Sequence, residues 1–273
     1  MDLSQILEIT SATDPGMVRS HNEDSIASDP ANGLVVLADG MGGYNAGEVA
    51  SGMATTVITT EVAQVLTKVQ PYEIDDRNEL AATRIVREQI LKANTSIYQA
   101  AQSQPQYAGM GTTLIVCLFY DNKVMVGHLG DSRVYMMRDG NFSQVTRDHS
   151  LLQEQIDSGL ITAEQAKTAA HKNLVTKALG IDWTVEPEIH EYEVKVGDIY
   201  LLCSDGLCDM VSDEDIGMTL SMLGANLKLA TQQLVQMAND NGGRDNVSVI
   251  LVRVLKEYPA ARGAMSKFFA WLK

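Results

Sequence analysis

The sequence predicts an α+β fold in which two antiparallel β-sheets carry helices on their outer faces. Short segments rich in Val, Ile, Leu and Tyr are bounded by Gly, Asp and Asn, as strands usually are. Two connections between them have the composition of hairpin turns, and two long helical segments follow the opening strands instead of alternating with single strands. The expected strands cover residues 6–12, 33–38, 112–120, 123–128, 133–137, 198–204 and 246–255.

The two hairpin signals lie in the middle of the chain. Residues 121–122 (DN) separate two of the expected strands, and residues 138–141 (RDGN) follow a third. Asp, Asn and Gly favour tight turns because they adopt positive φ angles at low cost. We therefore expect antiparallel pairing to dominate.

The two long helical segments are expected at residues 46–69 and 79–101. In the second, Val86, Ile90, Ala93 and Ile97 recur at steps of three and four, which is the spacing of one helix face. The first has a similar stripe, formed by Val49, Met53, Val57, Val62, Val65, Leu66 and Val69.

Shorter helices are expected in the second half of the chain. Ser212, followed by Asp215, resembles a capping box that opens a helix ending at Leu223. Another helix is expected over residues 227–239, before a pair of glycines. Residues 148–179 are helical but fragmented, with Gly159 as a stop signal.

Length and composition favour one domain over residues 1–255. The 273-residue chain has no internal repeat and no low-complexity linker. A formal net charge of −14 argues against nucleic acid and anionic membranes as general partners. The acidic excess fits either simple solubility or the binding of cations, and composition does not decide between them.

The same sequence predicts a cytoplasmic protein. The first ten residues lack the basic and apolar regions of a signal peptide. The apolar stretch 114–120 is far shorter than the roughly 20 residues that span a bilayer. The cysteines Cys117, Cys203 and Cys208 are expected to be reduced thiols, two of them in or beside apolar strands.

Four aspartates lie at the ends of expected strands, each within three residues of a glycine. They are Asp39, Asp131, Asp205 and Asp245. Each could belong to an ordinary turn, since Asp and Gly are common turn residues. Asp39 and Asp205, however, leave a strand toward a helical segment, which favours a cluster of carboxylates at one rim of the sheets.

Clustered carboxylates raise one another's pKa unless a cation neutralises them. Oxygen ligands without His or Cys are typical of Mg²⁺ or Mn²⁺ sites, and these ions often serve phosphate chemistry. Gly40 would allow close approach of the backbone, whose carbonyl can itself be a ligand.

With these residues assembled, the chain resembles the metal-dependent protein phosphatases, the type 2C serine/threonine family, in its bacterial form. The matching segments occur in family order over residues 8–255. They are 16-GMVRSHNED-24, 38-ADGMGG-43, 111-GTT-113, 130-GDSRVY-135, 146-TRDHS-150, 203-CSDGL-207 and 242-GGRDNVSVI-250.

The resemblance implies an α-β-β-α four-layer sandwich with a metal centre at one end of its sheets. It implies that Asp39 bridges two Mg²⁺ or Mn²⁺ ions and that the Gly40 carbonyl binds one of them. Asp205 and Asp245 would complete the protein ligands of the other ion. A third, weaker ion is implied at Asp131.

Three further residues have roles by the same resemblance. Glu23 and Asp24 would hold waters bound to the metals, and Arg19 would bind the substrate phosphate. The expected reaction is direct attack on phosphoserine or phosphothreonine by a metal-bridging hydroxide, with no phosphoenzyme.

The resemblance leaves one chemical step open. Many eukaryotic relatives place a His after the Asp-Gly pair to protonate the leaving alkoxide, and this chain has Met41 there. Water on the ion at Asp131 is the first candidate for the proton source. His149 is the second, although its setting also fits a structural role.

Two segments differ from the rest of the pattern. Residues 150–180 correspond to the family's mobile flap, but Ala169 and Ala170 replace the usual His-Pro, and His171 is displaced.

The C-terminal tail, residues 256–273, is basic and aromatic, and three interpretations remain open for it: packing on the protein itself, docking to a partner or membrane surface, and disorder.

The expected partners are phosphorylated Ser/Thr proteins and a cognate bacterial Ser/Thr kinase. Two alternatives remain. One is a catalytically silent pseudophosphatase that binds phosphoproteins, and the other is a phosphatase for small molecules or phosphotyrosine.

Overall fold

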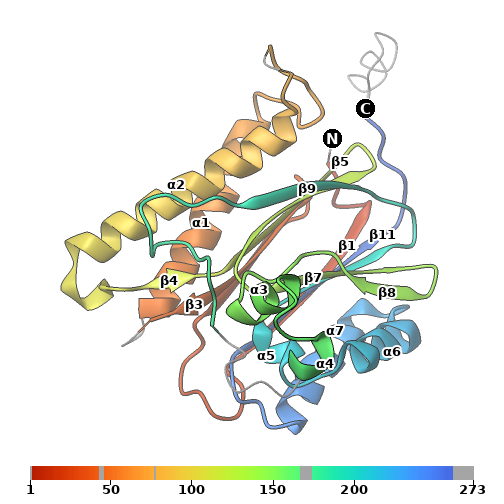
Figure 1. The fold of residues 1–273 in the computed structure, drawn as a ribbon. Coiled ribbons are helices and arrows are strands. Elements are labelled where there is room, and N and C mark those ends of the chain that lie inside the picture. Colours follow the sequence, from red (N-terminus) through yellow and green to blue (C-terminus); the bar gives the residue numbers. More distant parts are fainter. Residues whose placement is uncertain (1, 43–45, 77, 167–173, 261–273) are drawn as a thin grey trace, which may run out of the picture.

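The computed structural model describes all residues except 1, 43–45, 77, 167–173 and 261–273. Its centre is a pair of stacked antiparallel sheets (Figure 1). One sheet has the order β1 (Leu7–Asp14), β11 (Val247–Val254), β10 (Ile199–Cys203), β7 (Arg133–Arg138) and β8 (Asn141–Gln144). The other has the order β2 (Asp24–Asp29), β3 (Leu34–Met41), β5 (Leu114–Tyr120), β6 (Lys123–Leu129) and β9 (Glu188–Glu193), with the short β4 (Gly111–Thr112) paired to β3.

Helices cover the outer face of each sheet. The long helices α1 (Ala46–Leu66) and α2 (Ala81–Ser103) pack on the sheet that contains β3, and a 3₁₀ turn (Pro105–Tyr107) follows α2. On the other sheet lie α5 (Asp205–Cys208), α6 (Asp213–Leu223) and α7 (Leu227–Asp240). This arrangement confirms the expected α+β fold with helices outside two antiparallel sheets.

Three apolar layers hold the sandwich together. Two of them meet at each sheet, because successive side chains of a strand point to opposite faces of the sheet. In β5, Leu114, Val116 and Leu118 face the α1–α2 layer, whereas Ile115, Cys117 and Phe119 face the layer between the sheets. Successive side chains of a strand point to opposite faces, so a strand covered on both sides is apolar throughout. This is why residues 114–120 form the longest apolar stretch of the chain.

The expected strands are confirmed, but three strands were not expected with defined bounds. These are β2, β8 and β9, with the sequences DSIASD, NFSQ and EIHEYE. Each lies at the edge of its sheet, where polar and charged side chains are tolerated and limit pairing with other chains. Low apolar content therefore concealed them.

The expected face of α1 was only partly correct, since Val62 is buried as expected but most of the predicted stripe is not. Its buried residues include Ala50, Ala54 and Ile58, whereas Val49 and Met53 are only half-buried against the core. Small residues bring the helix axis close to the sheet, and the larger side chains then lie along the flanks of the contact. In α2, by contrast, the predicted residues Val86, Ile90, Ala93 and Ile97 are all buried.

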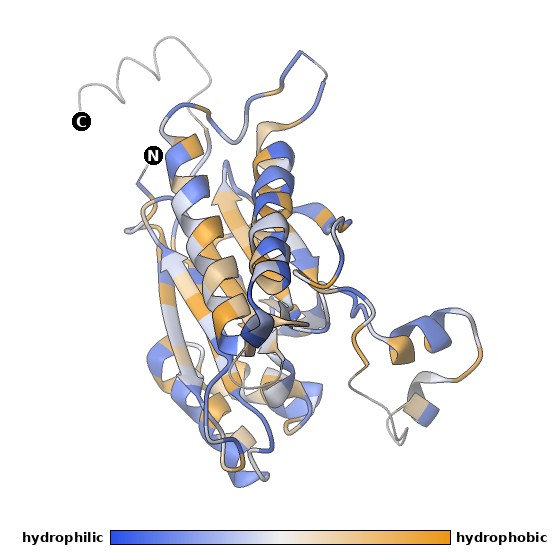
Figure 2. Ribbon diagram, turned by 90° about the vertical axis from the view of Figure 1, so that its left-hand side faces the viewer, coloured by the Kyte–Doolittle hydropathy of each residue, from blue (hydrophilic) through white to orange (hydrophobic). Residues whose placement is uncertain are grey.

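Within the segment 150–180, the part over residues 151–166 stands off one side of the sandwich (Figure 2). It contains α3 (Leu151–Asp157), whose N-cap Ser150 accepts a hydrogen bond from the Gln153 amide, and α4 (Ala163–Ala166). Gly159 follows α3 with a φ of 73°, as expected of a helix stop. The predictions for Ala169, Ala170 and His171 lie outside the described residues.

The remaining helix predictions are confirmed. Ser212 caps α6 by accepting a hydrogen bond from the Asp215 amide. Within the described part of the chain, no helix is long and apolar enough to cross a membrane.

Candidate metal centre

The ends of several strands surround one polar cavity of about 320 Å³. Strand β3, helix α5 and the turn before β11 each place a carboxylate or a backbone carbonyl in its wall. The lining residues are Arg19, Glu23, Asp39, Gly40, Met41, Gly42, Thr113, Asp131, Val175, Asp205 and Asp245. The four strand-end aspartates, far apart in sequence, therefore meet at one rim, as the sequence predicted.

Asp39 is held within strand β3 rather than at its end. The expected strand stopped at Ala38, but β3 continues to Met41 because Asp39 pairs with Asp24 on β2 and Gly40 pairs with Thr112 on β4. The Asp39 amide donates to Thr113 Oγ1 at 3.0 Å, and Thr112 Oγ1 donates to the Asp39 carbonyl at 2.8 Å. The backbone on both sides of the carboxylate is thereby fixed.

Thr113 also links this strand to Asp131. Its Oγ1 lies 2.8 Å from Ser132 Oγ, in a buried hydroxyl pair beside the cavity. Thr113 and Ser132 belong to motifs visible in the sequence, but their positioning role depends on a contact between two different loops, which residue spacing does not reveal.

Gly40 is required by its surroundings. A Cβ at this position would lie 2.2 Å from the Gly47 carbonyl oxygen and 2.5 Å from that of Glu23. Those contacts are with backbone atoms of α1 and of the loop before β2, which cannot move aside cheaply. Glu23 itself lines the cavity, and its amide donates to Asn246 Oδ1 at 2.8 Å.

Asp205 and Asp245 approach from the opposite sheet. Asp205 is the first residue of α5, two residues after β10 ends at Cys203, and not a strand terminus as expected. Asp245 lies two residues before β11 begins at Val247. A Cβ on Gly206 would lie 2.0 Å from the Asn246 carbonyl oxygen, so the two backbone segments touch.

Asp24 is placed differently from the other predicted site residues. It is buried and does not line the cavity. Its Oδ2 accepts a hydrogen bond from Ser204 Oγ at 2.8 Å, and the Ser248 amide donates to the same hydroxyl at 3.0 Å. Its Oδ1 is buried and has no hydrogen-bond partner among the described residues.

The electrostatics of this centre favour a cation. Burial raises the pKa of Asp39 and of Asp205 well above the ordinary value, and the charges of neighbouring carboxylates raise both further. Burial also raises the pKa of Asp24 and of Asp131 to about 6. The crowded carboxylates that line the cavity form an all-oxygen donor set that fits Mg²⁺ or Mn²⁺.

Arg19 brings positive charge to the rim of the cavity. Its Nη2 lies 2.7 Å from Asp245 Oδ2, and 53% of its side chain is exposed. This ion pair raises the pKa of Arg19. The guanidinium is thus beside the carboxylates and also open to a ligand arriving from solvent.

A separate cluster of possible metal ligands lies outside the cavity lining. Atoms of His128, His149 and Glu188 are all within 4.8 Å of one another. The two imidazoles are stacked in parallel planes, an arrangement in which one ion cannot lie in the plane of both rings. His149 Nδ1 accepts from the Gly130 amide at 3.2 Å, and its pKa is lowered to about 4 mainly by burial. These contacts fit a neutral, structural His149.

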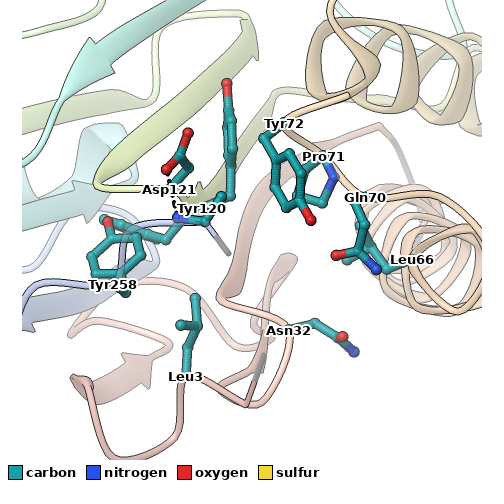
Figure 3. A pocket seen from close by; sticks show the side chains of 11 residues that line it. Leu3, Asn32, Leu66, Gln70, Pro71, Tyr72, Tyr120, Asp121 and Tyr258 are labelled. Atoms are coloured by element: carbon teal, nitrogen blue, oxygen red, sulfur yellow. Dashed lines mark hydrogen bonds between the residues drawn. The ribbon is translucent and has the colours of Figure 1, made fainter. Parts of the chain in front are cut away.

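A second, smaller pocket of about 100 Å³ lies near the last described residues (Figure 3). Tyr72, Tyr120 and Tyr258 contribute to its wall. Tyr258 is buried, its OH donates to the Lys123 carbonyl, and the Ala260 amide donates to Asp121 Oδ1. Tyr258 and Ala260 of the tail are therefore held against the protein itself, whereas the tail predictions for residues 261–273 lie outside the described residues.

Known proteins match this chain over most of its length. A family model described as "Protein phosphatase 2C" matches residues 18–252. The protein phosphatase PhpP of Streptococcus pneumoniae is 36% identical over 256 residues, which cover 92% of this chain and 99% of that protein. The serine/threonine protein phosphatase PstP of Mycobacterium tuberculosis is 35% identical over 267 residues, which cover 96% of this chain but 48% of that protein. This chain thus spans about half the length of the mycobacterial relative.

Solved structures agree with the sequence matches. The crystal structure of the M. tuberculosis phosphatase PstP/Ppp superimposes with a TM-score of 0.82 at 35% identity, covering 92% of this chain and 100% of that one. The PstP catalytic domain in complex with two manganese ions gives a TM-score of 0.79 at 35% identity, covering 92% of this chain and 99% of that one.

Proposed function

Because this chain belongs to the protein phosphatase 2C family, we propose that it is a Mg²⁺- or Mn²⁺-dependent serine/threonine protein phosphatase. The observation that carries the proposal is the cavity in which Asp39, Asp131, Asp205 and Asp245 meet below Arg19. A set of carboxylates this crowded is unfavourable in a folded protein unless it binds cations.

The ligands divide between the two sheets. Asp39 and the Gly40 carbonyl come from β3, and Asp205 and Asp245 come from the facing sheet, so ions held between them would connect both halves of the sandwich. Asp131 would hold a further ion. When bound, divalent cations lower the pKa of coordinated water and offset negative charge on a phosphoryl group.

Arg19 supplies the binding of the phosphate in this proposal. A guanidinium presents paired N–H donors that match two phosphoryl oxygens. Half-exposed at the rim, it can hold the phosphate of a protein side chain while the rest of the substrate stays on the surface. Glu23 lines the same cavity and is placed to accept hydrogen bonds from water there.

The proton for the leaving alkoxide must come from a group that reaches the cavity. Met41 lines the cavity and has no proton to donate, and His149 is outside the lining. We assign this task to the Asp131 position, which lines the cavity, because an ion held there would carry water able to donate the proton.

The substrates we propose are phosphoserine and phosphothreonine in proteins, with a cognate Ser/Thr kinase as the opposing enzyme. The names of the relatives support this class. The competing function, a silent phosphoprotein-binding module, is disfavoured because every predicted metal ligand is present.

The decisive experiment combines Mn²⁺ binding with hydrolysis. Calorimetric titration should detect Mn²⁺ binding that is lost in Asp39→Ala, and the wild-type chain should hydrolyse p-nitrophenyl phosphate and phosphothreonine peptides until EDTA is added. Mn²⁺ binding with phosphopeptide binding but without turnover would support the silent module. Activity that survives both chelation and Asp39→Ala would overturn the proposal.

A further inference from the structure

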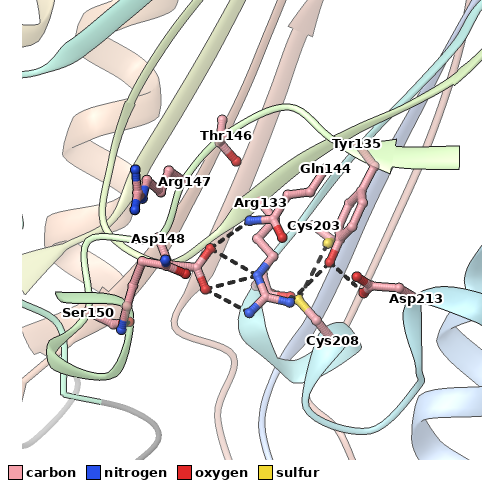
Figure 4. A network of polar contacts seen from close by, with 12 residues as sticks. Arg133, Tyr135, Gln144, Thr146, Arg147, Asp148, Ser150, Cys203, Cys208 and Asp213 are labelled. Atoms are coloured by element: carbon pink, nitrogen blue, oxygen red, sulfur yellow. Dashed lines mark hydrogen bonds and ion pairs between the residues drawn. The ribbon is translucent and has the colours of Figure 1, made fainter. Parts of the chain in front are cut away.

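Two cysteines lie on either side of Asp205 in the sequence, and their side chains lie close together beside Arg133 and Tyr135 (Figure 4). Cys203 is the last residue of β10 and is buried, and Cys208 is the last residue of α5 and is half-buried. Their sulfur atoms lie 3.8 Å apart. We propose that they form a reversible disulfide which weakens metal binding at Asp205, an inference that rests on the metal centre of the proposed function.

The geometry is close to that of a bond. A disulfide has an S–S length of about 2.05 Å, so the sulfur atoms need to approach by less than about 2 Å. Only four residues, 204–207, separate the two cysteines, and Asp205 is one of them. The Cys208 thiol now donates to the Ser204 carbonyl at 3.6 Å, and bond formation would replace that contact.

The surrounding polar network makes Cys208 the reactive thiol. The Arg133 guanidinium is held by Asp148, with Nη2 2.7 Å from Oδ2, and its Nη1 donates to the Tyr135 hydroxyl at 3.1 Å (Figure 4). A hydrogen bond from Cys203, followed by the charge of Arg133, lowers the pKa of Cys208 against the effect of burial. Cys208 is also the more exposed residue of the pair.

The oxidant we propose is a hydroperoxide. The Cys208 thiolate attacks the terminal oxygen, the O–O bond breaks, and the products are a sulfenic acid and, after protonation, water or an alcohol. The Cys203 thiol then attacks the Cys208 sulfur, the S–S bond forms, and the hydroxyl leaves as water with the thiol proton. The two thiols lose two electrons and the hydroperoxide gains them. A dithiol reductant reverses the change by thiol–disulfide exchange.

The consequence for the metal centre follows from the packing of Gly206. Its Cα faces the Asn246 carbonyl so closely that no Cβ fits, so α5 has no free space on that side. Drawing Cys208 toward Cys203 must therefore tilt or tighten the single turn that begins with Asp205. Metal sites tolerate only small errors in ligand position, and changes in the residues that support a ligand typically cost about 10–100-fold in affinity.

The third cysteine is an internal control. Cys117 is buried in the layer between the sheets, and its pKa is raised by burial. It faces other strands and not the Asp205 turn, so it should remain a thiol during mild oxidation.

The test uses the full chain treated with hydrogen peroxide, with three measurements. Alkylation and peptide mass mapping should identify a Cys203–Cys208 bond, with Cys117 alkylated. Calorimetry should show Mn²⁺ binding at least about tenfold weaker after oxidation and restored by dithiothreitol. Cys208→Ser, with Cys208→Ala as a second variant, should keep the reduced wild-type affinity and show no response to peroxide.

Two results would overturn the inference: both thiols remaining free under peroxide, or a disulfide that leaves Mn²⁺ affinity unchanged. Neither readout depends on turnover. A reduced chain that binds Mn²⁺ but hydrolyses no phosphate would therefore count against the proposed function while leaving the disulfide inference to be judged on its own measurements.

Discussion

Replacing Asp131 with Asn should stabilise the metal-free protein. Asp131 is 8% exposed, and its pKa is raised from 3.8 to about 6, first by burial and then by the charge of Asp148. Asn has the shape of the protonated acid but cannot ionise. The substitution therefore removes the cost of holding a negative charge in the cavity.

The sign and size of this effect follow from proton linkage. Because the folded pKa lies above the unfolded value, the favourable contribution of the protonated acid is complete below pH 3.8 and is lost as the pH rises through about 6. A difference of about two pKa units corresponds to about 3 kcal/mol. In EDTA at about pH 8, Asp131→Asn should raise the free energy of unfolding by up to about 3 kcal/mol.

Urea denaturation across pH, with and without Mn²⁺, measures this prediction. In EDTA the advantage of Asp131→Asn should shrink steadily as the pH falls from about 8 to about 4. With Mn²⁺ present it should shrink or reverse, because the ion neutralises the wild-type carboxylate. Asp76→Asn, at an exposed turn, is the matched control and should be neutral. A variant that is no more stable than wild type at high pH in EDTA would refute the reasoning.

Three further predictions concern the cavity and its walls. Arg19→Ala should raise the KM for a phosphothreonine peptide at least about tenfold, because it removes a phosphate ligand and no metal ligand. Mn²⁺ affinity, measured by calorimetry, should stay within a few-fold of the wild-type value. A loss of Mn²⁺ affinity as large as the rise in KM would contradict this prediction. In a urea titration, Gly206→Ala should lower the free energy of unfolding by more than about 2 kcal/mol, since its Cβ would lie 2.0 Å from the Asn246 carbonyl oxygen. The control is Gly52→Ala in α1, whose Cβ would meet nothing within 4 Å. It should be neutral or stabilising in the same titration. Asp39→Asn should abolish the rise in melting temperature that Mn²⁺ gives the wild-type chain, and a retained rise would show that Asp39 is not a ligand.

The sequence predicted the parts of the fold whose physical cause is local. Strand β5 is apolar because both of its faces are covered, and the stripe on α2 is regular because one of its faces packs against the sheet and α1. Most of the buried face of α1 was mispredicted because its contact depends on how closely the helix approaches β3. Small residues allow that approach, and nothing in the periodicity of the larger residues reports it.

The edge strands show a second limit. Residues 188–193 (EIHEYE) pair with β6 through backbone hydrogen bonds, and one face of β9 is mainly polar. Backbone pairing is independent of side-chain hydropathy, so a strand that buries little apolar surface leaves a weak pattern. The same holds for β2, which nevertheless aligns Asp24 with Asp39.

The candidate site was more predictable than these strands because it places charged residues where the fold favours apolar ones. Asp39 follows the apolar residues 34–38 within β3, and in the folded chain its pKa rises because burial and neighbouring carboxylates both oppose its charge. Local propensity and packing do not explain the carboxylate, although the close backbone packing around Gly40 does require the glycine beside it. Residues such as Thr113 and Asn246, which satisfy ordinary hydrogen-bonding rules, gave no comparable signal although they hold the same backbone segments. Burying a charged side chain destabilises a fold. A carboxylate in an otherwise apolar, buried segment therefore indicates a position that binds a cation.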